Sequence, residues 1–299
     1  MPAPSTTRRH SFSLLQWTLA ALVLGGTTTA QCTINVLGAS AAGISGGTPV
    51  PSVQAICTWD PDGPGPQPAL TVVGGTFTHA GNVPASNIAA FDSTTGQWRA
   101  LGTGCSGPVC AIEPLPNGDL VVGGAFSTAG GVVTNCVARW NGTSWSACGS
   151  GIGGPNAFVW CLAVAANGDV IVGGSFSTAG GTPAKDVALW DGNAWQSLAG
   201  GTSGFSFGVW GVLAMPNGDV IIGGQFSTVG GVAATCVARW NGTNWSPMGA
   251  LPSGAFSLAK GPNGEVYATD NGVHQWNGST WTSLAFPAST TLIRSCAVD

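Results

Sequence analysis

A stretch of about fifty residues recurs along the chain, and this repeat restricts the possible folds more than any other feature. The segment "VIVGGSFSTAGG" at residues 170–181 returns as "VVGGTFTHAG" from Val72, "VVGGAFSTAG" from Val121 and "IIGGQFSTVG" from Ile221. The first glycines of the four copies are separated by 49, 50 and 50 residues. A fixed period of this length is typical of proteins built from repeated structural units.

Each copy resolves into four short apolar runs, which in the third copy are "FVWCLAVA", "VIVGGSF", "DVALWD" and "WQSLAGG". In this copy the turn "NGD" joins the first two runs, a Gly/Ser loop joins the second and third, and "GNA" joins the last two. Asn-Gly between two apolar runs predicts a β-hairpin. Two hairpins in series make a four-stranded antiparallel meander. The sequence therefore predicts an all-β fold, a β-propeller of four-stranded antiparallel blades with about five recognisable repeats and a partial sixth blade.

Two sets of residues recur at fixed places in the repeat, and we expect both to be structural. The double glycines should allow a close backbone approach where a Cβ would clash. The aromatic residues of the third and fourth strands should fill the space between blades. The predicted structural residues are Gly74, Gly75, Gly123, Gly124, Gly173, Gly174, Gly223, Gly224, Trp98, Trp140, Trp145, Trp190, Trp195, Trp240, Trp245, Trp276 and Trp281.

The pattern of four apolar residues, "GG", and then an aromatic residue and a tryptophan five to seven positions apart resembles kelch-type repeats. The copies are also similar to the secreted "GGxF…ARWNGxxW" repeats of bacterial surface proteins and to the propeller of the fungal cortical polarity-marker family. The resemblance covers residues 53–285. It implies a propeller fold, and propellers of this kind serve binding, scaffolding and occasionally catalysis.

The order of segments along the chain predicts an exported protein. Residues 1–30 combine Arg8 and Arg9 with an apolar run and small residues before Gln31, as in a signal peptide. We therefore predict a secreted or cell-surface protein, with no transmembrane segment in the mature chain. An N-terminal segment with a possible closing strand follows at 31–52. The blades are expected at 53–104, 105–152, 153–202, 203–250 and 251–286, with the partial blade at 290–299.

Ring closure has two readings at this point. "TLIRSCAVD" at the C-terminus matches a first strand and "CTINVLGASAAG" near the N-terminus is similar to a last strand, but the two middle strands of that blade are missing. Either five full blades close irregularly, or the chain is part of a six- to eight-bladed propeller.

Composition and motifs argue against several kinds of site. Only 7% of residues are charged and the formal net charge is −4, so no basic surface for nucleic acid is expected. The glycine loops lie between strands and carry no lysine, unlike a phosphate-binding loop. The turn carboxylates Asp119, Asp169, Asp219 and Glu265 occur one per blade, too far apart for a shared metal. Tyr267 is the only tyrosine, which argues against copper-radical oxidase chemistry. No cofactor or metal is predicted.

The nine cysteines suggest one specific disulfide. Cys136 and Cys148 flank the hairpin "ARWNGTSW" at balanced distances, and a bridge would form if their Cβ atoms lie about 4 Å apart. The alternative is a pair of buried free thiols.

The remaining candidate is a binding surface on the rim that carries the long loops, because loops on a rigid ring often bind partners. Residues that vary between the copies are the binding candidates, namely His79, Asn82, Asn87, Asn135, Lys185 and Asp186. The leading hypothesis is a non-enzymatic propeller that binds protein or glycan. One alternative is a carbohydrate-active hydrolase or lyase, which would need exposed tryptophans and paired carboxylates. Trp160 and Trp210 are expected in the core. The other alternative is a purely structural envelope module.

Overall fold

The computed structural model describes residues 43–284 except 48–49, 64, 205–207 and 252. These residues form strands, turns and bends, and within them no helix is long and apolar enough to cross a membrane. The predicted fold class is confirmed: the described chain is an all-β propeller of four-stranded antiparallel blades. The predicted signal peptide at 1–30 and the partial blade at 290–299 lie outside the described residues.

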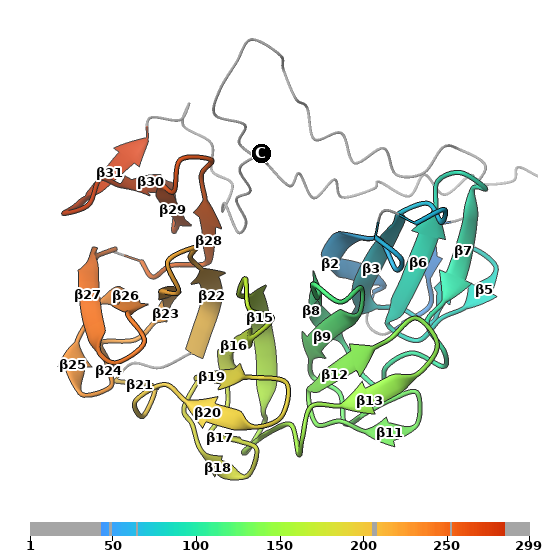
Figure 1. Ribbon diagram of the computed structural model, residues 1–299, viewed down its shortest axis with the longest axis horizontal. Helices are drawn as coiled ribbons and strands as arrows, with labels where there is room; N and C mark the ends of the chain where they lie inside the picture. Colours follow the sequence, from blue (N-terminus) through green and yellow to red (C-terminus); the bar gives the residue numbers. More distant parts are fainter. Residues whose placement is uncertain (1–42, 48–49, 64, 205–207, 252, 285–299) are drawn as a thin grey trace, which may run out of the picture.

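Five four-stranded sheets follow one another along the chain and curve around a central axis (Figure 1). The strands are β2 (Ser52–Trp59), β3 (Leu70–Thr76), β6 (Ile88–Asp92) and β7 (Gln97–Ala100) in blade 1; β8 (Val109–Pro114), β9 (Leu120–Gly124), β12 (Val137–Trp140) and β13 (Trp145–Ala147) in blade 2; β15 (Phe158–Val164), β16 (Val170–Ser175), β19 (Val187–Trp190) and β20 (Trp195–Ser197) in blade 3; β22 (Gly208–Ala214), β23 (Val220–Gln225), β26 (Cys236–Trp240) and β27 (Trp245–Ala250) in blade 4; and β28 (Ser257–Lys260), β29 (Val266–Thr269), β30 (Val273–Trp276) and β31 (Trp281–Leu284) in blade 5. The first strand of each blade faces the axis and the fourth faces outward (Figure 1).

Short strands in the links and long loops form smaller sheets on one rim. They are β1 (Ile44–Ser45), β4 (His79–Ala80), β5 (Val83–Pro84), β10 (Thr128–Ala129), β11 (Val132–Val133), β14 (Ile152–Gly153), β17 (Thr178–Ala179), β18 (Thr182–Pro183), β21 (Thr202–Ser203), β24 (Thr228–Val229) and β25 (Val232–Ala233). In blades 1, 3 and 4 the incoming segment adds a strand to the hairpin of the long loop, as β14 does to β17. Each long loop is thereby tied to the chain that enters its blade.

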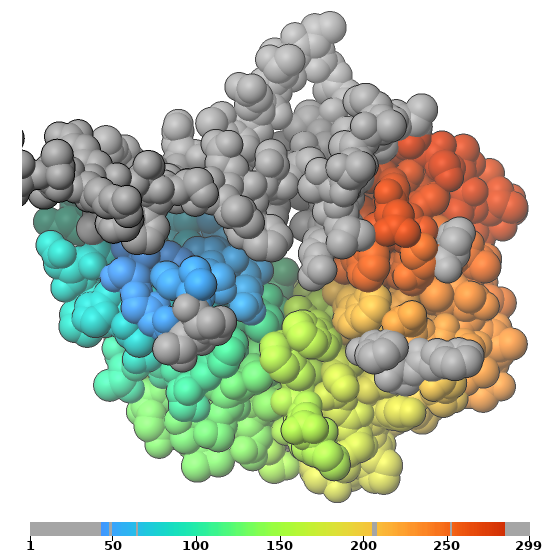
Figure 2. All heavy atoms as spheres, turned by 180° about the vertical axis from the view of Figure 1, so that it is seen from behind, coloured from blue at the N-terminus to red at the C-terminus, as the bar shows by residue number. Residues whose placement is uncertain are grey.

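Apolar side chains fill the space between neighbouring blades. Separate buried clusters join blades 1 and 2, 2 and 3, 3 and 4, and 4 and 5. The spheres in Figure 2 show neighbouring blades in continuous contact. Both faces of an internal blade are therefore covered, which explains why its strands are apolar on both sides.

The recurring tryptophans connect the blades as predicted, and they also form hydrogen bonds. In each blade the two aromatic residues form a tilted pair with ring centroids 5.1–5.3 Å apart. In blades 2 to 5 the second tryptophan of the pair donates its indole N–H to a backbone carbonyl of the preceding blade. The donor–acceptor distance is 2.8 Å from Trp145 to Leu101, 2.8 Å from Trp195 to Cys148, and 2.9 Å from Trp245 to Leu198.

The two glycines of each repeat have different functions. A Cβ on the first glycine would overlap a side chain of the next blade, as Gly123 would with Val159. A Cβ on the second would overlap a carbonyl oxygen of the inner strand, as Gly174 would with Phe158. At this close approach the inner strand contains a β-bulge, for example between Val159 and Cys161. The expected close approach of the backbone is therefore present, and it sits beside the bulge.

Candidate functional site

A cavity of about 360 Å³ lies along the central axis, where the inner strands of blades 2 to 5 meet. Its lining comes from β8, β15, β22 and β28, and includes Glu113, Trp210 and Lys260. We call it the channel cavity. Its volume is in the range of small-molecule binding sites, and it combines apolar walls with a few polar groups.

Glu113 is the acidic residue that lines the channel cavity. It is the fifth residue of β8 and is partly buried. Desolvation by burial raises the pKa of Glu113 from 4.5 to about 7, because the charged form loses contact with water. A carboxyl group with a pKa near neutrality can both accept and release a proton under physiological conditions.

Lys260 brings a positive group to the same cavity. It is the last residue of β28 and is exposed. Neither polar residue belongs to the repeat, since Ala214 of blade 4 stands where blade 5 has Lys260, and Leu213 stands where blade 2 has Glu113. The channel cavity is therefore chemically asymmetric within a nearly symmetric ring.

In blades 1 to 4 one residue interrupts the inner strand near its start. Register shifts occur on β2, β8, β15 and β22, and the residues inside them are Gln54, Cys110, Trp160 and Trp210. Phe256 occupies the equivalent place just before β28, seven residues ahead of the turn asparagine, as Trp210 and Trp160 do. Since all five inner strands run in the same direction, these five residues lie at one end of the channel. We call them the bulge ring.

The bulge corrects the expectation that Trp160 belongs to the core. Trp160 is 42% exposed, and it is the only tryptophan among the exposed large hydrophobic residues of the described chain. Regular alternation would direct residue 160 into a neighbouring blade, but the bulged residue lies outside that alternation. Trp210 lines the channel cavity. The sequence signal was the pair of tryptophans fifty residues apart that do not belong to the late-strand pairs.

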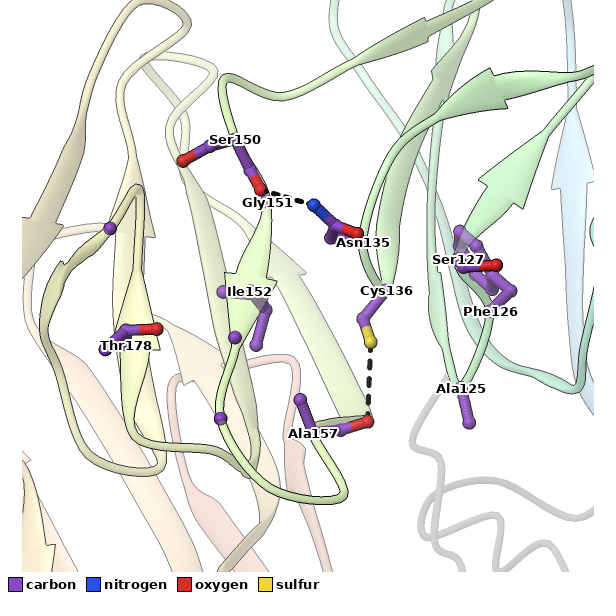
Figure 3. A pocket seen from close by; sticks show the side chains of 13 residues that line it. Ala125, Phe126, Ser127, Asn135, Cys136, Ser150, Gly151, Ile152, Ala157 and Thr178 are labelled. Atoms are coloured by element: carbon purple, nitrogen blue, oxygen red, sulfur yellow. Dashed lines mark hydrogen bonds between the residues drawn. The ribbon is translucent and has the colours of Figure 1, made fainter.

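A second cavity, of about 590 Å³, lies on the rim between blades 2 and 3. Asn135 is the predicted binding residue that lines it, and its side-chain amide donates to the carbonyl oxygen of Ser150 at 2.9 Å (Figure 3). The Cys136 thiol donates to the carbonyl oxygen of Ala157 at 3.4 Å. Both side chains therefore bond to the backbone of the link between the blades, and these hydrogen bonds stabilise the fold.

Two further binding candidates, Asn87 and Asp186, also form hydrogen bonds within the fold. Asn87 and Asp186 occupy equivalent positions, both with φ 65°. Their Oδ1 atoms accept the backbone N–H of Phe77 and Phe176, respectively. Asn87 also donates to the carbonyl oxygen of Cys105 at 2.8 Å, and Asp186 accepts the hydroxyl of a threonine in the next link at 2.5 Å.

The remaining rim candidates are exposed, His79 and Asn82 on the long loop of blade 1 and Lys185 on that of blade 3. His79 contacts the Thr78 hydroxyl through Nδ1 at 3.0 Å. The structure does not gather the six predicted residues around one cavity. Their binding role stays a prediction.

Cys136 and Cys148 are not bridged in the structure. Both are buried free thiols in the cluster between blades 2 and 3. Burial raises the pKa of the Cys148 thiol to about 12, so it stays protonated at neutral pH. The observed arrangement therefore corresponds to the free-thiol alternative and not to the predicted disulfide. Cys32 and Cys296 lie outside the described residues.

The turn carboxylates are engaged within their own blades. Asp119 and Asp219 form ion pairs with Arg139 and Arg239, one strand away. Within the described residues, no group of three or more His, Cys, Asp and Glu side chains is placed to hold a metal ion.

Comparison with known proteins supports a propeller of repeated units. Residues 115–143 match the family described as "Domain of unknown function (DUF5122) beta-propeller". No curated protein sequence matches the chain.

Two solved structures resemble the chain at 13% identity. One is the X-ray structure of a "putative gluconolactonase", with a TM-score of 0.45, covering 75% of this chain and 76% of that one. The other is a catalytically inactive virginiamycin B lyase from Staphylococcus aureus with quinupristin, with a TM-score of 0.41, covering 59% and 55%. The prediction that the protein is not an enzyme is corrected, because both similar structures carry the names of enzymes. At this similarity they say nothing of the reaction, which has to be argued from the residues of the site.

Proposed function

We propose that the protein is a carbohydrate-active hydrolase or lyase whose active site is the channel cavity. The observation that carries the proposal is the position of Glu113, which lines the same cavity as Lys260 and Trp210. A proton-transferring group, a positive charge and an aromatic surface in one cavity are the components of a site for a polar, ring-shaped substrate.

The pairing of one carboxyl group with one ammonium group favours the lyase reaction. In a β-elimination, the Glu113 carboxylate takes the proton from the carbon next to a substrate carboxylate. The Lys260 ammonium group offsets the negative charge that develops there. The bond to the leaving sugar oxygen then breaks, a carbon–carbon double bond forms, and Glu113 returns the proton to the leaving oxygen. This route uses a single residue as base and then as acid.

The raised pKa of Glu113 suits both steps. At neutral pH a substantial fraction of the group is ionised and ready to accept a proton, and the protonated form is acidic enough to release it. An ordinary exposed glutamate, with a pKa near 4.5, would be a weaker base.

Export is part of the same proposal and rests on the residues of the 1–30 segment. The arginine-flanked apolar run supports secretion, and the "GG" and tryptophan spacing supports a kelch-type repeat. An extracytoplasmic protein would meet polysaccharides directly.

The test is a turnover assay of the mature chain on neutral and acidic oligosaccharides, following both new reducing ends and the ultraviolet absorbance of an unsaturated product. Glu113→Gln should lower kcat by about a hundredfold or more. Glu265→Gln is the matched control, because it makes the same chemical change in the turn of blade 5 and should leave the rate unchanged. Equal rates for Glu113→Gln and the wild type would contradict the proposal.

A further inference from the structure

The bulge ring divides into a polar part and an aromatic part. In blades 1 and 2 the Cys110 thiol donates to Oε1 of Gln54 at 2.7 Å. In blades 3 to 5 the corresponding residues are Trp160, Trp210 and Phe256. We call these three the aromatic arc. Side chains from neighbouring blades meet in both parts, Cys110 with Gln54 and Trp210 with Phe256.

The aromatic arc is organised into two stacks. Trp160 lies on Phe158 of the same strand, with ring centroids 3.8 Å apart and planes 20° apart. Trp210 lies on Phe256 of the next blade, with centroids 5.3 Å apart and planes 17° apart. Trp160 is exposed and its ring is held against Phe158, so it has few conformations to lose when a ligand binds to it.

The aromatic arc adjoins the channel cavity. Trp210 belongs both to the arc and to the wall of the cavity, and Glu113 lies further along the same cavity. The arc and Glu113 therefore adjoin the same cavity. The arc also lies on the rim that carries the long loops, since Val159 beside the bulge pairs with Gly174 at the end of the second strand.

We propose that the aromatic arc is a sugar-binding subsite at the entrance of the channel, on which a pyranose ring of a glycan stacks while the chain extends toward Glu113. This deepens the proposed function and rests on it for the identity of the ligand. The apolar face of a pyranose fits an aromatic plane, and the Gln54 amide across the ring supplies a polar group for its hydroxyls.

Binding can be separated from turnover with a chain that carries Glu113→Gln. Six-residue neutral and acidic oligosaccharides, cellohexaose and hexagalacturonic acid, are titrated into this variant by calorimetry. In that background Trp160→Ala should weaken binding of at least one of them by about tenfold. Trp160→Phe keeps a stacking ring and should stay within about threefold. Val133→Ala is a control on the outer hairpin of blade 2, where Val133 is 65% exposed, and should bind unchanged.

The outcomes distinguish the two proposals. Weaker binding by Trp160→Ala together with full turnover by Glu113→Gln supports the subsite and contradicts the proposed function. Unchanged binding by Trp160→Ala, with turnover lost in Glu113→Gln, overturns the subsite and leaves the proposed function standing. Normal binding by Trp210→Ala would also overturn the subsite. So would a failure of both oligosaccharides to bind the Glu113→Gln chain. Thermal melting of each variant checks that it is folded.

Discussion

The backbone of Gly174 lies directly against Phe158, so that a Cβ on Gly174 would overlap the carbonyl oxygen of Phe158. Val159 pairs with Gly174, and the bulge that follows releases Trp160 toward solvent. The glycine of the repeat and the exposed tryptophan of the channel are thus parts of one local structure. The motif that builds the blade also shapes the surface at the end of the channel.

Gly174→Ala should be strongly destabilising because the new methyl group meets rigid backbone. We expect a loss of about 2–4 kcal/mol in the free energy of unfolding, measured by urea denaturation. Gly181→Asn in the adjoining loop is the control, since a Cβ there meets no atom within 4 Å and asparagine tolerates its φ of 80°. Equal stability of Gly174→Ala and the wild type would contradict the close approach.

The two tryptophans of blade 2 should respond differently to replacement by phenylalanine. Trp145 donates to the carbonyl oxygen of Leu101, whereas Nε1 of Trp140 is buried without a partner among the described residues. Trp145→Phe should cost about 1–2 kcal/mol, and Trp140→Phe should cost less because it removes an unsatisfied donor. Blade 1 already has Phe91 at the place of Trp140. Chemical denaturation of both variants checks the order, and the reverse order would argue against these hydrogen bonds.

Glu113 should make the stability of the fold depend on pH. In the unfolded chain the carboxyl group ionises near 4.5, but in the folded chain it does so near 7. The folded state holds the extra proton between these values, so its stability falls as the pH rises through this window. The loss is on the order of 3 kcal/mol and persists at higher pH.

Glu113→Gln removes this ionisation. At pH 8 the variant should therefore be more stable than the wild type, and at pH 4 the difference should disappear. Urea denaturation of both chains across this range measures the difference, and parallel pH profiles would show that Glu113 is not desolvated.

The cysteines of the described chain should be present as unreactive thiols. Burial raises the pKa of Cys105 and Cys148 to about 12, which leaves very little thiolate at neutral pH. Without a reductant, Cys136 and Cys148 should alkylate slowly in the native protein and completely after unfolding. Peptide mass mapping reads the result directly. A disulfide-linked pair of peptides containing the two residues would contradict this expectation and support the predicted disulfide.

The periodic part of the sequence was sufficient to predict the blades. The glycine pairs and late-strand aromatic residues act through contacts that repeat in every blade, and repeated contacts leave a repeated pattern. Trp160 was misplaced because simple alternation assigned it to the core, and a one-residue bulge reverses that assignment.

The channel cavity was not predictable for a different reason. Glu113 and Lys260 occupy positions that blades 3 and 4 fill with apolar residues, so no period marks them. They share a cavity only because the ring brings β8 and β28 to one axis. The predicted rim residues were chosen because they vary, yet Asn87 and Asp186 vary within a shared backbone conformation and hold the links between blades.

The most direct measurement is the pH dependence of kcat/KM on an oligosaccharide that the protein cleaves. If Glu113 in the channel is the proton-transferring group, one limb of the profile should have an apparent pKa of about 7. Glu113→Gln should abolish that limb together with most of the rate, while Glu265→Gln keeps both. A wild-type profile that is flat from pH 5 to 9, or the same limb in Glu113→Gln, would contradict the channel as the active site.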